Sequence, residues 1–125
     1  MLGDKNVMAD IAVKDLQAAK DFYVGKLGLK LNKENEYEVL LNSGTTLVHV
    51  YKSEFAGTNK ATTCTFISDN VEGDVDELKA MGIKFEHYEL PGVTMMGDVH
   101  VMGDEKAAWF KDPDGNTLCV GSPNF

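Results

Sequence analysis

The stretch that decides the fold is Trp-Phe-Lys-Asp-Pro-Asp-Gly-Asn-Thr-Leu, at positions 109–118 of the 125-residue chain. Its centre, Asp-Pro-Asp-Gly-Asn, combines the residue types that favour a tight turn. The residues on either side are apolar or β-forming, which predicts one strand near 107–111 and a final strand near 117–120. The C-terminal part of the chain is therefore expected to end in a β-hairpin.

A second motif, Val-Lys-Asp-Leu-Gln-Ala-Ala-Lys-Asp-Phe-Tyr, lies at 13–23. The segment before it, at 7–13, alternates in a way that predicts a strand with two distinct faces. Asp15 is placed to cap a helix whose apolar residues recur at helical spacing, and Gly28 is placed to end it. Further strands are predicted downstream, separated by turn-forming residues.

The same order of elements returns in the second half of the chain. A β-rich segment at 62–67 precedes a predicted helix for which Asp69 is the expected cap. When the halves are superimposed in sequence, Asp15 aligns with Asp69, and 27–31 aligns with 81–85 at the same offset. We therefore predict an α+β protein built from two strand–helix–strand–strand–strand modules.

Charge and composition exclude several classes of protein. There are 12 Lys and Arg against 20 Asp and Glu, so the net charge is 12 − 20 = −8. An acidic chain without a basic run is a poor partner for nucleic acid or an anionic membrane. No apolar run approaches the length of about 20 residues that spans a bilayer, and no leader segment is evident. We expect a cytoplasmic protein in which Cys64 and Cys119 are small buried residues without a disulfide.

The motifs at 13–23 and 109–118, with Leu-Gly-Leu at 27–29, resemble those of the vicinal oxygen chelate (VOC) superfamily. That superfamily includes glyoxalase I, bleomycin resistance proteins and extradiol dioxygenases. The resemblance covers about 7–120, which is nearly the whole chain. It says more about fold than about reaction, because this fold hosts many functions.

The resemblance implies a single VOC domain over 1–125, in which two βαβββ modules form a curled mixed-sheet cleft. Module one would span about 5–52, a hinge about 53–61, and module two about 62–121. It also implies a homodimer. The pairing of modules within one chain or across two chains stays open at this level.

Metal-dependent members of the superfamily carry His, Glu or Gln at four cleft positions. The resemblance places Met8, His49, Thr63 and Cys119 at these positions. A thioether and a hydroxyl are poor ligands for hard or borderline divalent ions, and His49 with Cys119 would need two further ligands to hold zinc. We therefore expect no cofactor, with a divalent ion held by His49 as the alternative.

The residues of the implied cleft are the candidate site. His49 and Asp10 are the candidate catalytic pair, since a histidine can exchange protons near neutral pH; the alternative is a hydrogen-bonded histidine and a solvent-exposed aspartate. The stretch 97–104 is expected to be a loop covering the cleft, or else an ordinary surface loop. The expected ligand-binding residues are Met8, Asp10, His49, Tyr51, Thr63, Thr65, His100, Trp109 and Cys119.

Three functions are consistent with this reading. The first is a glyoxalase/bleomycin-resistance-like protein that holds a small organic ligand without breaking a bond. The second is a lyase, isomerase or dioxygenase that uses a divalent metal at His49, or a metal-free variant that uses His49 and Asp10 as acid and base. The third is a structural dimerisation module. Three of the four metal positions are unsuited to the metal, so the first function is preferred and catalysis stays an open question.

Overall fold

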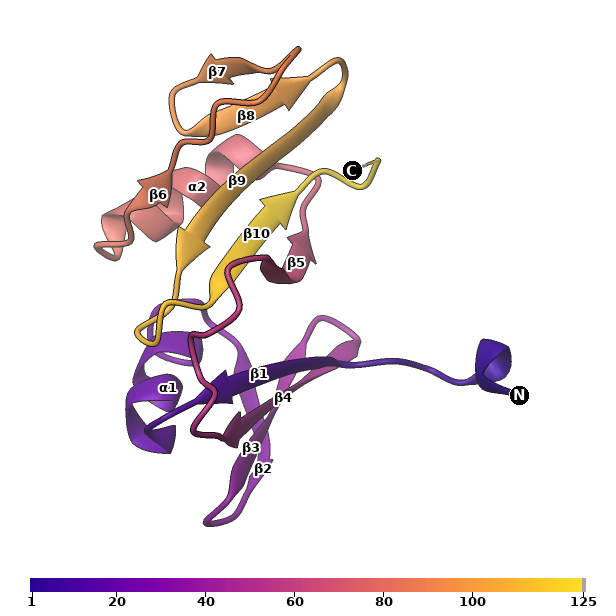
Figure 1. Cartoon of the computed structure of the whole chain (residues 1–125), viewed down its shortest axis with the longest axis vertical. Coiled ribbons are helices and arrows are strands. Elements are labelled where there is room, and N and C mark those ends of the chain that lie inside the picture. Colours follow the sequence, from indigo (N-terminus) through magenta and orange to yellow (C-terminus); the bar gives the residue numbers. More distant parts are fainter. Residues whose placement is uncertain (125) are drawn as a thin grey trace. The chain divides into compact units, whose positions relative to one another are not determined.

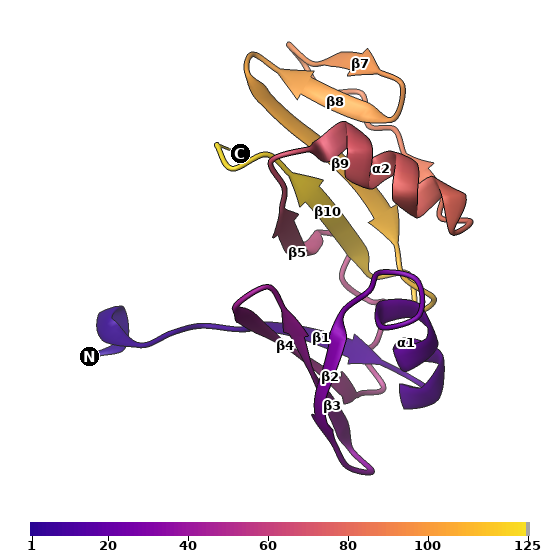
Figure 2. The ribbon, with the colours of Figure 1, turned by 180° about the vertical axis from the view of Figure 1, so that it is seen from behind.

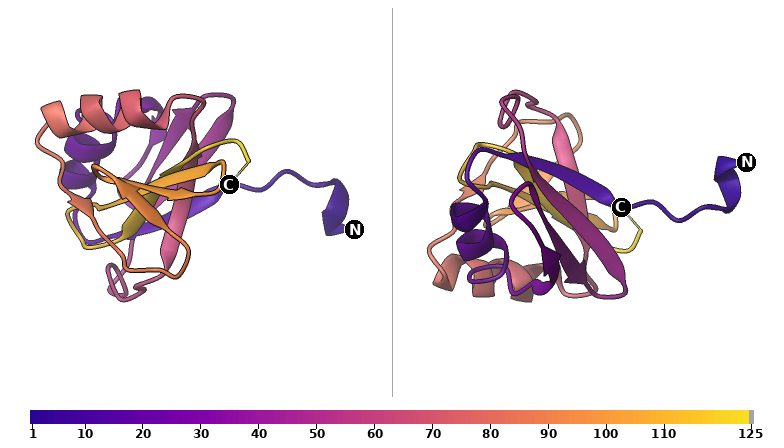
Figure 3. Two further views of the ribbon diagram at one scale, coloured as in Figure 1. Left: turned by 90° about the horizontal axis from the view of Figure 1, so that it is seen from above. Right: turned by 90° about the horizontal axis from the view of Figure 1, so that it is seen from below.

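The computed structural model describes residues 1–124, and the chain separates into two compact units with their boundary between Gly57 and Thr58. Each unit contains one sheet and one α-helix (Figure 1). The views in Figure 3 show each helix lying over one face of its own sheet. The predicted α+β class is confirmed, with two sheets in which most neighbouring strands are antiparallel.

The first unit has a four-stranded sheet in the order β1-β4-β3-β2. Strand β1 runs parallel to β4, and the other neighbours are antiparallel. Its elements are a short 3-10 helix (Leu2–Asp4), β1 (Ala9–Val13), α1 (Leu16–Tyr23), β2 (Lys30–Glu34), β3 (Glu38–Ser43) and β4 (Thr46–Lys52). Alternate residues of the sheet are buried against α1, as an amphipathic helix on a sheet requires. These buried residues are Ile11, Val13, Val39, Leu41, Val48 and Val50.

Local chemistry sets the ends of α1. The Asp15 carboxylate accepts hydrogen bonds from the backbone N–H groups of Gln17 (2.8 Å) and Ala18 (3.1 Å), so the predicted cap is confirmed. After the helix, Gly28 adopts a φ of 81°, in the left-handed region that favours glycine. Asp15 and Gly28 thus fix where the chain enters and leaves the helical segment.

The second unit has a larger sheet, in the order β5-β10-β9-β8-β7 (Figure 2). A two-residue strand, β6, also pairs with β9. The elements are β5 (Thr62–Ile67), α2 (Val71–Ala80), β6 (Phe85–Glu86), β7 (Thr94–Met96), β8 (Val99–Met102), β9 (Glu105–Lys111) and β10 (Thr117–Gly121). Helix α2 lies against β8, β9 and β10. The buried core of this unit includes Phe110, Leu118 and Val120.

The cap predicted for α2 was wrong, because the neighbouring residue takes that role. Asn70, not Asp69, caps the helix, and its side-chain oxygen accepts a hydrogen bond from the Gly73 N–H at 3.1 Å. Ser68 holds this start in place, because its hydroxyl oxygen accepts from the Asn70 N–H at 2.9 Å and its hydroxyl donates to Asp74. The cap that corresponds to Asp15 is therefore Asn70, one residue beyond the aligned Asp69, whereas Gly28 and Gly82 both take positive φ at aligned positions.

The prediction of a loop at 97–104 was also wrong. Most of this stretch forms β8 and its turns, and β8 pairs with both β7 and β9. Asp98 stabilises the turn between β7 and β8. Its carboxylate accepts hydrogen bonds from Lys79 Nζ (2.7 Å) and His87 Nε2 (2.6 Å). These two bonds hold the pKa of the Asp98 carboxyl below its usual value.

The hairpin predicted at 107–120 is confirmed by the pairing of β9 with β10. Its turn is built around Asp112, which is 5% exposed. One carboxylate oxygen accepts from the backbone N–H groups of Asp114 and Asn116, at 2.9 and 2.8 Å. The other accepts from the Asn116 side-chain amide at 2.8 Å.

Within residues 1–124, no helix is both long enough and apolar enough to cross a bilayer.

Candidate functional site

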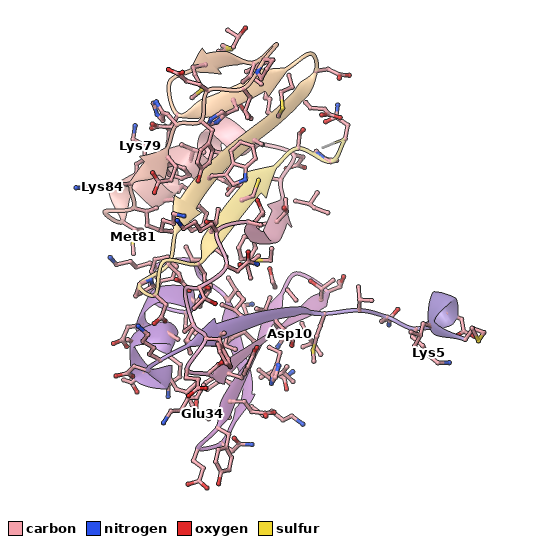
Figure 4. The ribbon with its side chains drawn as sticks, in the orientation of Figure 1. Lys5, Asp10, Glu34, Lys79, Met81 and Lys84 are labelled. Carbon is pink, nitrogen blue, oxygen red and sulfur yellow. The ribbon has the colours of Figure 1, made fainter. Side chains whose placement is uncertain are left out.

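The sheet of the first unit has an open face, opposite α1, that carries polar side chains. Asp10 of β1 and His49 of β4 are paired directly in register, and Asp10 is labelled on β1 in Figure 4. Their neighbours along the strands, Ile11, Val48 and Val50, are buried on the α1 side. Because side chains alternate along a strand, Asp10 and His49 project together from the open face.

Two carboxylates flank the His49 ring. His49 Nδ1 lies 2.7 Å from Asp10 Oδ1, and His49 Nε2 lies 3.6 Å from Glu38 Oε2. A carboxylate only accepts hydrogen bonds, so the short contact assigns the proton of the neutral ring to Nδ1. Nε2 then carries the lone pair and points toward Glu38. The Tyr51 ring stacks on the His49 ring, with centroids 5.3 Å apart and an interplanar angle of 10°.

This cluster remains accessible to solvent. The side chains of His49, Asp10 and Glu38 are 22%, 59% and 44% exposed. A partly covered imidazole between two solvated carboxylates has two chemical uses. It can exchange a proton through Nε2, or it can join the carboxylates in binding a cation.

The structure brings together three of the residues predicted in this unit, Asp10, His49 and Tyr51. Met8 lies just before β1 and is exposed. Glu38 was missed by the sequence analysis. The signal was present, because the turn at 43–46 sets a hairpin register in which Glu38 pairs with Tyr51. A carboxylate placed there has to share the face of His49.

The second unit carries an aromatic cluster on the face of its sheet opposite α2. Trp109 lies at its centre and is 9% exposed. The His100 and Tyr88 rings meet it edge to face, with centroid distances of 4.8 and 5.5 Å. Met102 packs on the same group, together with Ala107 and Cys119. The Trp109 indole Nε1 donates to the Thr62 hydroxyl at 3.1 Å.

His100 is fully buried, so it does not lie in a surface loop as predicted. Its Nε2 accepts a hydrogen bond from the Tyr88 N–H at 2.9 Å, which requires that nitrogen to be unprotonated. Burial lowers the pKa of His100, and the nearby His87 acts in the same direction. His100 is therefore a neutral structural histidine that fixes Tyr88 against Trp109.

This burial predicts a pH dependence of stability. Unfolded His100 regains its usual pKa of 6.5, whereas the folded residue titrates lower. The unfolded chain therefore binds more protons below about pH 6.5, and the free energy of unfolding falls as the pH decreases through that window. Urea denaturation at pH 7.5 and pH 5 measures the effect. His100→Gln keeps an acceptor for Tyr88 but removes the titration, so its stability should change less; an equal change would contradict the assignment.

The remaining predicted residues of the second unit lie on β5 and β10. Thr65 and Cys119 are paired in register, and the Thr65 hydroxyl hydrogen-bonds with the Cys119 thiol. Thr63 is half-buried beside a register shift between β5 and β10. Cys64 and Cys119 are both free cysteines.

The residues at the four implied metal positions do not fit the family's metal. Cys119 is fully buried, and burial raises the pKa of its thiol to about 11, so the thiol is protonated in the metal-free protein and a metal ion would have to displace its proton. Met8 and Thr63 offer only a thioether and a hydroxyl. Among residues 1–124, no group of three or more His, Cys, Asp or Glu side chains is arranged to hold a metal ion.

Comparison with solved structures finds the same fold in several proteins. A bleomycin resistance determinant encoded on transposon Tn5 is 16% identical, covering 97% of this chain and 99% of its own, with a TM-score of 0.76. A lactoylglutathione lyase from Agrobacterium tumefaciens is 19% identical, covering 96% and 94%, with a TM-score of 0.72. TnmS3, an antibiotic binding protein from Streptomyces sp. CB03234, is 20% identical, covering 93% of each chain, with a TM-score of 0.65.

No curated protein matches the sequence. The sequence does match the family model of the Glyoxalase/Bleomycin resistance protein/Dioxygenase superfamily over residues 6–120, which is most of its length. That match includes both motifs and both helices. The chain therefore belongs to the Glyoxalase/Bleomycin resistance protein/Dioxygenase superfamily.

Proposed function

We propose that this protein binds a small organic cation, without chemical change, through Asp10, His49 and Glu38. The supporting observation is the pair of partly exposed carboxylates on either side of His49. Within residues 1–124, neither carboxylate forms an ion pair with a lysine, so their charge is balanced only by His49 when it is protonated. A cationic ligand would supply the missing positive charge.

The aromatic ring beside the carboxylates suits the same kind of ligand. One face of the Tyr51 ring stacks on His49, and the half-buried ring adds aromatic surface beside the carboxylates, which is suited to cations and planar groups. The net charge of −8 adds a favourable long-range field for a cation. Two proteins of the same fold are described as a bleomycin resistance determinant and an antibiotic binding protein, which is consistent with a binding role.

The proposal is tested by titrating the protein with bleomycin and with ethidium, a planar aromatic cation, in the presence of EDTA. Isothermal calorimetry should detect saturable binding of at least one of them. Asp10→Asn and Glu38→Gln should each weaken that binding about tenfold, as expected for a hydrogen bond or ion pair to a charged group. Glu36→Gln is the matched control, because Glu36 is an exposed carboxylate outside the cluster.

Two results would contradict this function. One is that neither probe binds at concentrations up to millimolar. The other is an equal loss of affinity in Glu36→Gln and in the two cluster variants, because the effect would then be one of overall charge. Binding that is lost when EDTA is added would show that a metal ion is required.

A second candidate is metal-free acid–base catalysis, and the 2.7 Å contact between Asp10 and His49 favours it. In this role Asp10 would orient the ring, and His49 Nε2 would remove a proton next to a carbonyl group, as in an isomerase or lyase. This chemistry is tested by incubating the protein with dihydroxyacetone in D2O and following by NMR the incorporation of deuterium at the carbon atoms. Exchange that is equal with wild type and His49→Gln would exclude His49 as the base.

A further inference from the structure

Three lysines in the described part of the chain are partly buried, and they differ in their partners. Lys20 Nζ lies 3.0 Å from Glu34, and Lys106 pairs with Glu72. Lys111 Nζ donates only to the Thr117 hydroxyl, at 2.6 Å, and forms no ion pair within residues 1–124. An ammonium group that is partly removed from water is costly unless an anion compensates it. Lys111 thus has unused capacity to bind an anion.

The residues around Lys111 add further hydrogen-bond donors on the face of the sheet that carries Trp109. Lys111, Thr117 and Thr62 are neighbours in register across β9, β10 and β5. Thr117 is 2% exposed, and its hydroxyl points to the Lys60 carbonyl at 3.5 Å. Thr62 is exposed and accepts from the Trp109 indole N–H, so its own hydroxyl hydrogen remains available.

We propose that Lys111 and Thr62 bind the carboxylate of an aromatic acid, with the ring of the ligand on the face of the sheet that carries Trp109. The ammonium and the hydroxyl supply two donors, and a carboxylate has two oxygens that accept them. Trp109 and Lys111 occupy alternate positions of the same strand, so both side chains project from one face. All residues of this site belong to the second unit, and its charge is opposite to that of the proposed cation site.

Glu86 limits where the anion can lie. It pairs with Trp109 on the β6 side of the sheet, and the pKa of Tyr88 is raised first by burial and then by the negative charge of Glu86. A second carboxylate beside β6 would be repelled. The carboxylate is therefore directed toward the Lys111 end of the face, which is the end that carries the free donors.

The single tryptophan gives a direct readout of binding. The protein is labelled with ¹⁵N, and the indole N–H signal of Trp109 is followed by NMR during titration with 2-naphthoate. Lys111→Met should weaken binding about tenfold, the value of one charge-assisted hydrogen bond at a partly exposed site. Lys111→Arg, and the matched control Lys106→Met, should stay within about twofold of the wild-type dissociation constant.

Two further titrations use the wild-type fold and so do not depend on how well the variants fold. The neutral amide, 2-naphthamide, should bind about tenfold more weakly than 2-naphthoate if the carboxylate is recognised. Inorganic phosphate should not displace 2-naphthoate at equal concentration. Equal binding of acid and amide, equal losses in Lys111→Met and Lys106→Met, or displacement by phosphate would each overturn the proposal. Asp10→Asn should leave this titration unchanged, which separates it from the cation site.

Discussion

Replacement of Phe110 by alanine is expected to lower the free energy of unfolding by about 3–5 kcal/mol. Phe110 is fully buried in β9, and its ring lies 5.5 Å from the Phe85 ring. Its neighbour across the hairpin, Leu118, is also fully buried. Removing the ring leaves a cavity between the sheet and α2, because close-packed cores relax only partly around a lost side chain.

Phe55→Ala provides the matched control for this measurement. Phe55 is 68% exposed, so the same chemical change should alter stability by no more than about 0.5 kcal/mol. Urea denaturation followed by circular dichroism gives both values. A similar loss in the two variants would mean that Phe110 does not anchor the core of the second unit.

Replacement of Asp112 by alanine should cost about 3 kcal/mol or more, although no large side chain is removed. The buried carboxylate accepts hydrogen bonds from three N–H groups of the turn, contributed by Asp114 and Asn116. Removing it deprives those three donors of this acceptor, and each buried donor that stays unsatisfied costs about 1–3 kcal/mol. The strands β9 and β10 would lose the turn that aligns them.

The variant Asp112→Asn keeps the volume of the side chain but changes its hydrogen bonds, so it separates these two effects. Its amide keeps one oxygen that can accept from the two backbone donors, but its NH₂ group faces the Asn116 amide donor. We expect it to lose about half as much stability as the alanine variant. Denaturation midpoints of both variants check this order. If Asp112→Asn loses as much stability as Asp112→Ala, the negative charge, and not the remaining acceptor oxygen, accounts for the effect.

The parts of the fold that could be predicted from sequence are those set by local chemistry. Asp15 caps α1, Gly28 takes the left-handed conformation, and the turn at 112–116 makes a hairpin, because each depends on residues only a few positions apart. The cap of α2 could not be assigned in this way. Asp69 and Asn70 are both good cap residues, and a contact between Ser68 and Asp74 accompanies the choice of Asn70.

Features that depend on distant residues were missed or only partly predicted. The β7–β8 hairpin is held by bonds from Lys79 and His87 to Asp98, which no local pattern reveals. The resemblance implied that Asp10 and His49 lie in one cleft, but the 2.7 Å contact depends on the parallel register of β1 with β4. The burial of His100 similarly follows from the pairing of β8 with β9, which the sequence analysis had treated as a loop next to a strand.

The parallel pairing of β1 with β4 also has a consequence for the expected order of folding. Strands β3 and β4 are joined by a short turn around Gly44, whereas α1, β2 and β3 all lie in the chain between β1 and its partner β4. In the second unit, α2 and four further strands lie between β5 and its partner β10. Loop-closure entropy increases with the length of the closed segment. We therefore expect the antiparallel hairpins to form first, and β1 and β5 to pair last with strand edges that are already in place.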